Sequence, residues 1–128
     1  MLIGELSRTC NCPVETIRYY ERIGLLPPAS RRPNRYRCYD EIHVNLLRFI
    51  VRAKQLGFTQ DETRQLTELA QRKNPACSEV FAILDKQHRE VVDRIARLRK
   101  MERTLLQLKD QCCNGTRNDC PVLEVLMQ

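Results

Sequence analysis

Four of the seven cysteines of this 128-residue chain lie in its second half, in a pattern typical of a metal site. They are Cys77, Cys112, Cys113 and Cys120. Thiolates favour soft or borderline metal ions, and the last three cysteines cluster in a short segment whose Gly115 permits a tight reversal. The simpler alternative is that Cys77 and Cys112 are small core residues.

The stretch between these cysteines, 78–112, has the apolar spacing of one long helix without Gly or Pro. A seven-residue repeat runs along it through Leu84, Val91, Leu98, Leu105 and Cys112. In the second half, Met101 and Leu108 supply the second apolar position of a coiled-coil repeat. A single helix cannot bury such a stripe against itself, so we expect a partner, most simply the same helix from a second copy.

Cys77 lies on the same stripe as Cys112, 35 residues earlier. At about 1.5 Å of rise per residue, roughly 52 Å separates the two within one chain, too far to share a ligand. If two such helices pair antiparallel, Cys77 of one chain meets Cys112 of the other at each end of the pair. Cys113 and Cys120 follow just beyond. The sequence therefore predicts a site of three or four thiolates that forms only in a homodimer.

The net charge of +6 is concentrated in the first half of the chain. Residues 1–60 hold 10 Lys and Arg against 5 Asp and Glu, whereas residues 61–128 hold 12 against 11. A basic amino-terminal half indicates a polyanion binder joined to a segment with another role. The alternative is that this charge only keeps the protein in solution.

Two short helices joined by a tight turn are predicted near the amino terminus. The first covers residues 3–9. The second begins at Pro13, with Cys12 as an unusual cap, and buries Val14 and Ile17. Its other faces present Thr16, Arg18, Tyr19, Tyr20 and Arg22. This is the arrangement of a helix-turn-helix, although an ordinary amphipathic helix pair has the same pattern.

The next segment, residues 29–39, favours the helix-turn-helix because it holds four arginines and two tyrosines around a Pro33-Asn34 turn. We expect a small two-stranded hairpin, a wing. Its candidate phosphate-binding side chains are Arg31, Arg32, Arg35 and Tyr36. Farther along, Asp40 caps a third helix that runs to Leu56 and is stopped by Gly57. Thr59 and Glu62 form a capping box for a fourth helix, and a short helix at 122–127 ends the chain.

These motifs resemble the MerR family of bacterial transcription regulators. The residues that carry the resemblance are Ile-Gly-Glu-Leu at 3–6, Val-Glu-Thr-Ile-Arg-Tyr-Tyr-Glu-Arg at 14–22, Gly-Leu-Leu at 24–26, Asn-Arg-Tyr-Arg at 34–37 and Leu-Gly-Phe-Thr-Gln-Asp-Glu at 56–62. The paired cysteines near the carboxyl end, followed by Cys-Pro-Val-Leu at 120–123, are similar to the metal-sensing branch when taken with Cys77.

The resemblance implies a mainly α fold in three parts. Residues 1–75 would form a winged helix-turn-helix DNA-binding domain with a small β wing and linking helices. Residues 76–111 would form a long antiparallel coiled-coil dimerisation helix, and residues 112–128 a metal-binding loop with a short terminal helix. By family position, the residues in or beside the major groove would be Thr16, Arg18 and Tyr19, and those holding the DNA backbone Arg31, Arg35 and Tyr36.

The resemblance also implies a mechanism. A homodimer would bind double-stranded promoter DNA in which the spacer between the two elements bound by RNA polymerase is too long. The two elements would therefore not be correctly oriented for the polymerase. Metal binding would change the dimer, which bends and untwists the DNA and realigns those elements, a use of DNA deformability as a switch. The chain would thus activate a heavy-metal resistance promoter.

The donor set narrows the choice of metal. Cys77, Cys112 and Cys120 suit Hg(II), Pb(II) or Cd(II), and adding Cys113 gives a tetrahedral set for Cd(II) or Zn(II). Copper(I) sensors resemble this loop spacing but carry Ser in place of Cys77, and a third thiolate favours a divalent ion. Zinc sensors carry a loop His that is missing here, whereas cadmium-and-lead sensors often have a cysteine where Cys12 stands. We expect a Cd, Pb or Zn sensor, with Hg as the alternative.

Other classes of function are also open. A thiol redox sensor on the same scaffold would use a reversible disulfide. A thiol enzyme or metal-storage protein is disfavoured, because the sequence has no Cys-x-x-Cys motif or Gly-rich phosphate loop, and both His43 and His88 are isolated. The first residues lack the features of a signal peptide, and no apolar run reaches membrane-spanning length. We therefore expect a cytoplasmic protein without a membrane partner.

Overall fold

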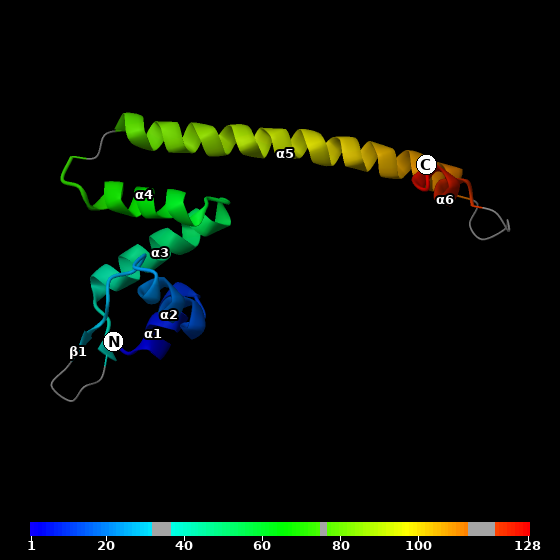
Figure 1. The fold of residues 1–128 in the computed structure, drawn as a ribbon. Helices are drawn as coiled ribbons and strands as arrows, with labels where there is room; N and C mark the ends of the chain where they lie inside the picture. Colours follow the sequence, from blue (N-terminus) through cyan, green and yellow to red (C-terminus); the bar gives the residue numbers. More distant parts are fainter. Residues whose placement is uncertain (32–36, 75–76, 113–119) are drawn as a thin grey trace. The chain divides into compact units, whose positions relative to one another are not determined.

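The computed structural model describes residues 1–31, 37–74, 77–112 and 120–128. Within these ranges the chain forms helices and one two-stranded sheet (Figure 1): α1 (Ile3–Cys10), α2 (Val14–Arg22), β1 (Ser30–Arg31), β2 (Arg37–Cys38), α3 (Glu41–Gln55), α4 (Gln60–Gln71), α5 (Cys77–Gln111) and α6 (Pro121–Leu126). The chain forms two compact units, Met1–Leu84 and Asp85–Gln128, and the boundary between them lies within α5. The fold is mainly helical with a small β element, as the sequence predicted.

The predicted helix pair at the amino terminus is α1 and α2, joined by a tight turn. Asn11 adopts a left-handed conformation with φ of 51° and ends α1, a role for which Asn is suited. The prediction that Cys12 caps α2 was wrong. Pro13 takes the position before the first helical residue, and no side chain caps α2 there. Cys12 is instead 4% exposed and lies in the core, because its small apolar thiol gains more from burial than from solvent.

The buried side of α2 is wider than the sequence predicted. Ile17 is fully buried as expected, and Val14 is half-buried. Tyr20, expected on an outer face, is also buried, three residues after Ile17 and on the same side of the helix. Its ring adds apolar area to a core that includes Leu6, Leu26 and Leu47.

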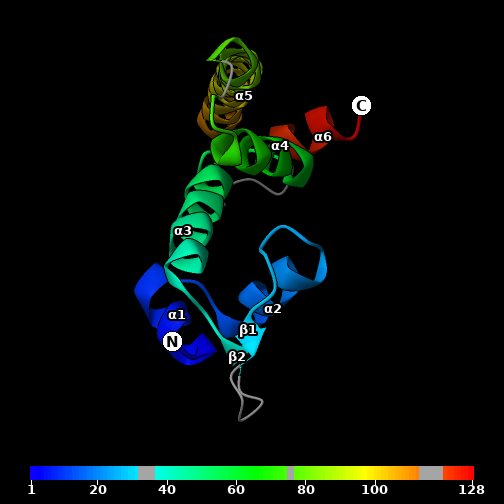
Figure 2. The ribbon, with the colours of Figure 1, turned by 90° about the vertical axis from the view of Figure 1, so that its left-hand side faces the viewer.

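The predicted wing is present as an antiparallel pair in which Ser30 lies opposite Cys38 and Arg31 opposite Arg37. Figure 2 shows the pair beside α2. Met1 anchors its base, since the N–H of Tyr39 donates to the carbonyl of Met1 at 2.7 Å. The tip of the wing lies outside the described residues.

The third and fourth helices carry the predicted start signals. Asp40 precedes α3, and its backbone N–H donates to Nδ1 of His43 at 3.0 Å. His43 is buried, and its ring lies edge-on to that of Tyr39 with the centroids 5.2 Å apart. For α4, the N–H of Glu62 donates to Oγ1 of Thr59 at 3.1 Å, and the N–H of Thr59 donates to Oε1 of Glu62 at 2.9 Å. The predicted capping box is therefore confirmed.

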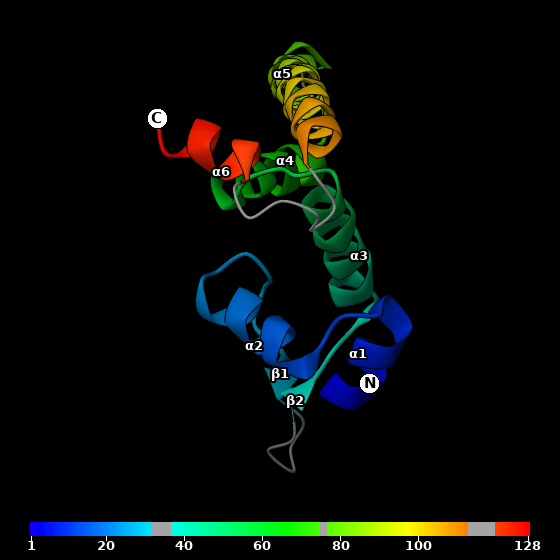
Figure 3. The same cartoon turned by 90° about the vertical axis from the view of Figure 1, so that its right-hand side faces the viewer.

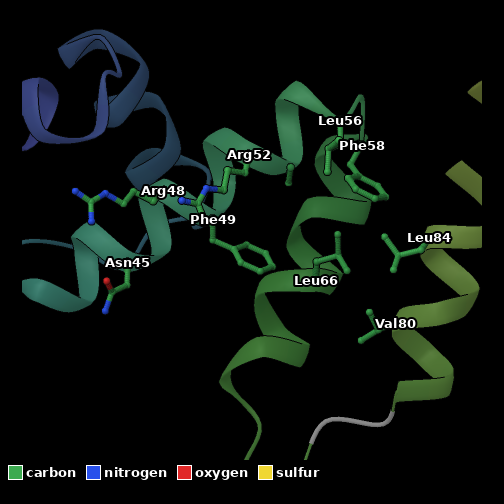
Figure 4. A pocket seen from close by; sticks show the side chains of 10 residues that line it. Asn45, Arg48, Phe49, Arg52, Leu56, Phe58, Leu66, Val80 and Leu84 are labelled. Atoms are coloured by element: carbon green, nitrogen blue, oxygen red, sulfur yellow. The ribbon is translucent and has the colours of Figure 1, made fainter. Parts of the chain in front are cut away.

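The beginning of α5 packs on the α3–α4 hairpin. Val80 and Ile83 contact a small core formed by Ala53, Phe58 and Leu66. An apolar hollow of about 560 Å³ lies beside this core, and Figure 4 shows Leu66 and Val80 turned toward each other across it. These contacts fix the first two turns of α5 on the amino-terminal unit.

The long helix predicted at 78–112 is observed as α5, one continuous helix of 35 residues. Its apolar stripe is exposed in the single chain, at Leu84, Val91, Leu98, Met101 and Leu105. The carboxyl end of α5 and the short α6 are drawn orange and red in Figure 3. Exposed apolar side chains on α6 include Leu123, Val125 and Leu126.

Candidate nucleic-acid interface and metal-binding cysteines

The exposed face of α2 presents a row of polar and aromatic side chains. Arg18 is exposed, and its Nη1 lies 3.4 Å from Oε1 of Glu15. Tyr19 is 40% exposed, and the guanidinium carbon of Arg22 lies 5.5 Å from the centre of its ring. This cation–π contact orders two groups that can both bind nucleic acid. Thr16, the third predicted groove residue, is half-buried.

The wing residues predicted to hold the DNA backbone are only partly covered by the structure. Arg31 lies on β1, opposite Arg37 of β2, and the description of Arg31 extends only to its backbone. Arg32, Arg35 and Tyr36 lie outside the described residues. Their assignment stays a prediction.

Arg37 is a candidate residue that the sequence reasoning missed. With Arg18 of α2 it lines a surface hollow of about 500 Å³, which we call the α2–wing hollow, whose other lining residues are Leu2, Ile3 and Tyr39. Two guanidinium groups from different elements thus face one space, which suits a phosphate. The signal was available, because Arg37 is one of the four arginines of the predicted wing at 29–39.

Tyr39 closes the inner side of this hollow. It is 1% exposed, and burial together with the nearby carboxylate of Glu21 raises the pKa of Tyr39 to about 12, although the nearby Arg37 lowers it. The phenol is therefore neutral at physiological pH, and the charges of the hollow come from its arginines.

The predicted metal ligands are spread along α5 and beyond it. Cys77 is the first residue of α5 and is exposed, whereas Cys112 is exposed directly after the helix. Cys120 is half-buried before α6, and Cys113 lies outside the described residues. Within the described ranges, one chain brings no three His, Cys, Asp or Glu side chains together as a metal site. The three described thiols are all free and chemically suited to a soft divalent ion.

Cys10 and Cys12 are unsuited to this role. Both lie in the amino-terminal core, and Cys10 donates a weak hydrogen bond to the carbonyl of Val44 at 3.7 Å. Burial raises the pKa of each thiol, which disfavours the thiolate that metals bind. The two cysteines therefore serve packing in the amino-terminal core.

No helix in the described part of the chain combines the length and apolar character needed to cross a membrane.

Comparison with known families matches two models along the chain. The model described as "MerR HTH family regulatory protein" matches residues 1–69, and the one described as "MerR, DNA binding" matches residues 44–108. Together they cover α1 to most of α5.

Relatives match over nearly the full length. The "Heavy metal-dependent transcription regulator 2" of Rhizobium meliloti (strain 1021) is 40% identical over 124 residues, covering 97% of this chain and 84% of that protein. The structure of the transcription regulator PbrR691 from Ralstonia metallidurans CH34 in complex with lead(II) is 40% identical, covers 98% of both chains and has a TM-score of 0.85.

A second metal complex is also similar. The dual function transcriptional regulator MerR from Bacillus megaterium MB1, in complex with mercury(II), is 32% identical, covers all of both chains and has a TM-score of 0.76. The family models, the near-complete coverage and the shared fold agree with the motifs of the sequence. The chain therefore belongs to the MerR HTH family of regulatory proteins, in its metal-responsive branch.

Proposed function

We propose that the protein activates a heavy-metal resistance promoter when a divalent soft metal ion, Cd(II), Pb(II) or Zn(II), binds to thiolates shared between two chains. Membership of the family already makes it a metal-responsive transcription regulator and not an enzyme. The observation that carries the proposal is the placement of two exposed cysteines, Cys77 and Cys112, at opposite ends of the 35-residue α5.

The ligand set would come from both subunits. Cys77 of one chain would join Cys112 and Cys120 of the partner subunit, and Cys113 would supply a fourth thiolate. Cys77 is the first residue of α5 and is exposed there, so its thiol is accessible to an ion and to a partner chain. A bound divalent ion would supply the positive charge that neutralises thiolates brought together from two chains. The exposed apolar stripe of α5 supports the homodimer that this set requires.

DNA binding would use α2 and the wing. Thr16, Arg18 and Tyr19 would lie in or beside the major groove, and the backbone would be held by Arg31, Arg35 and Tyr36. The dimer would distort a promoter with an overlong spacer, so that RNA polymerase can bind both of its elements. Bending the promoter DNA costs a few kcal/mol. Contacts that differ between the two states of the dimer would have to supply this free energy.

Mercury(II) is the second candidate. Three thiolates suit this ion, and the Bacillus megaterium relative was solved with mercury(II). The lead(II) complex of the more similar relative favours the first candidate. A thiol redox sensor on the same scaffold would need no metal at all.

Transcription from the regulated promoter, with purified protein and polymerase, tests these alternatives. Zn, Cd, Pb, Hg and Cu(I) are titrated one at a time. We expect activation by Cd, Pb or Zn, loss of this activation in Cys77→Ser, and no loss in Ser78→Ala, an exposed neighbour in the same helical turn. Activation by mercury alone would select the second candidate, and activation by an oxidant without metal would select the redox sensor.

A further inference from the structure

Glu21 lies near the carboxyl end of α2. Its side chain is 11% exposed, and its Oε2 lies 3.9 Å from Nη1 of Arg37 on the wing. Its Oε1 is buried and lacks a hydrogen-bond partner in the described part of the chain. Burying a carboxylate oxygen without such a partner costs free energy. The described groups that interact with this carboxylate are the Tyr39 hydroxyl, whose pKa it raises, and the Arg37 guanidinium of the wing.

A contribution to folding stability does not explain the contact between Glu21 and Arg37. The side chain of Arg37 is 54% exposed, and an ion pair that is long and half in solvent contributes little to folding. The Tyr39 hydroxyl, which is also buried, has no hydrogen bond of normal geometry among the described residues. Glu21 and Arg37 nevertheless shift the pKa of Tyr39 in opposite directions, so the three side chains lie together where α2 meets the wing.

The position of Arg37 suggests what the contact is for. Arg37 contacts Glu21 and also lines the α2–wing hollow together with Arg18. A free arginine side chain samples many rotamers, and ordering it on binding costs entropy. A carboxylate fixed on α2 reduces this cost by holding the guanidinium before DNA arrives.

We propose that Glu21 is a positioning residue for DNA binding, which holds Arg37 of the wing so that Arg37 and Arg18 face the DNA backbone together. This inference rests on the proposed interface of α2 and the wing. Glu21 itself carries a negative charge and does not contact the phosphate. It acts through Arg37 and couples the wing to the helix in the groove.

The test measures affinity for the operator and for unrelated DNA of the same length, by fluorescence anisotropy with the full chain at several salt concentrations. Arg37→Ala should weaken operator binding and lower the slope of log K against log salt by about 0.9, the loss of one phosphate contact. Glu21→Gln should weaken binding to the operator and to unrelated DNA alike, by about fivefold, because a backbone contact is independent of sequence. Glu5→Gln, which neutralises an exposed acid on α1, is the matched charge control and should not weaken binding to either DNA.

The double variant decides whether Glu21 acts through Arg37. In the Arg37→Ala background, Glu21→Gln should change operator affinity by less than about 1.5-fold, because non-additivity reports a shared interaction. An equal loss in both backgrounds, or no loss in either, would overturn the proposal. If Glu21→Gln does not fold, Arg37→Lys tests the same claim, since it keeps the charge but not the planar group, and full operator affinity would then contradict it. If neither Arg18→Ala nor Arg37→Ala weakens binding, the interface assignment itself fails.

Discussion

The hydroxyl of Tyr19 donates a hydrogen bond to Oε1 of Gln60 at 3.2 Å. A side chain assigned to the DNA groove thus also contacts the first residue of α4, the helix that precedes the long α5. A second link of this kind runs from Arg64 of α4, whose Nη2 donates to the carbonyl of Ile23 at 2.8 Å. The helix proposed to lie in the DNA groove, α2, and the residue that follows it, Ile23, are therefore each joined to α4 by a hydrogen bond.

Tyr19→Phe and Gln60→Ala separate the two roles of the Tyr19 hydroxyl. Both variants lose the same hydrogen bond, so each should lower the free energy of unfolding by less than about 1 kcal/mol, as expected for an exposed pair. Only Tyr19→Phe should weaken operator binding, by about 5- to 10-fold, because only it removes a group available to DNA. Urea unfolding and operator titration measure the two effects. An equal loss of affinity in both variants would show that the hydroxyl acts by placing the helix alone.

The capping box of α4 gives a prediction about stability. Thr59→Ala removes the oxygen that accepts the N–H of Glu62, and the free energy of unfolding should fall by about 1 kcal/mol. The control is Thr9→Ala, which removes an exposed hydroxyl that bonds within α1 and should have an effect within about 0.5 kcal/mol. Equal effects of the two substitutions in urea unfolding would rule out a special contribution from the cap.

Thiol reactivity should divide the cysteines into two groups. Cys10 and Cys12 are buried with raised pKa values, so iodoacetamide should modify them only when the protein unfolds. Cys77 and Cys112 are exposed and should react in the native protein, and Cd(II) should protect them. Mass spectrometry of digested samples measures each site. Protection of Cys12 by Cd(II), at a concentration that leaves Cys77 reactive, would move the metal site to the amino-terminal unit.

Tyr39 gives a prediction about alkaline pH. Its pKa is about 12 in the folded state, against about 10 in an unfolded chain, so the folded state holds the phenolic proton more tightly. The corresponding stability is fully present below pH 10 and is lost as the pH rises toward 12, up to about 3 kcal/mol. The free energy of unfolding should fall less steeply across this range in Tyr39→Phe. In Glu21→Gln, the absorbance at 295 nm should show Tyr39 ionising at lower pH, and an unchanged titration would contradict the contact between the two groups.

Local patterns predicted most of the fold because the physics behind them is local. The capping box at Thr59, the end of α3 before Gly57 and the seven-residue repeat of α5 each depend on residues a few positions apart, and the structure has all three. The positions of Cys12 and Tyr20 were predicted wrongly because both side chains are suited to the surface as well as to the core. Packing against α1 and α3 decides between these, and no local pattern contains that information.

The candidate site, like the fold, could be predicted from the sequence only in part. The chemistry of Arg18, Tyr19 and Cys77 could be read from residue type and position, and the first two are exposed on α2 as expected. The contact of Glu21 with Arg37 joins residues 16 positions apart on a helix and a strand, so only the fold reveals it. The joining of cysteines from two chains is a prediction that one chain cannot test.

Metal binding by mixed dimers tests the shared site most directly. One chain carries Cys77→Ser, and the other carries Cys112→Ser, Cys113→Ser and Cys120→Ser. Different affinity tags on the two chains allow the mixed dimer to be purified. In an antiparallel pair, one end of this dimer has no thiolates from the set, and the other keeps all of them.

We expect two ions per wild-type dimer, one per mixed dimer and none in either variant homodimer, measured by Cd(II) titration of the thiolate charge-transfer absorbance. The homodimers serve as controls, since each lacks part of the set at both ends. If the mixed dimer bound no Cd(II), or if the Cys77→Ser homodimer still bound two ions with unchanged affinity, the site would not be shared between the chains.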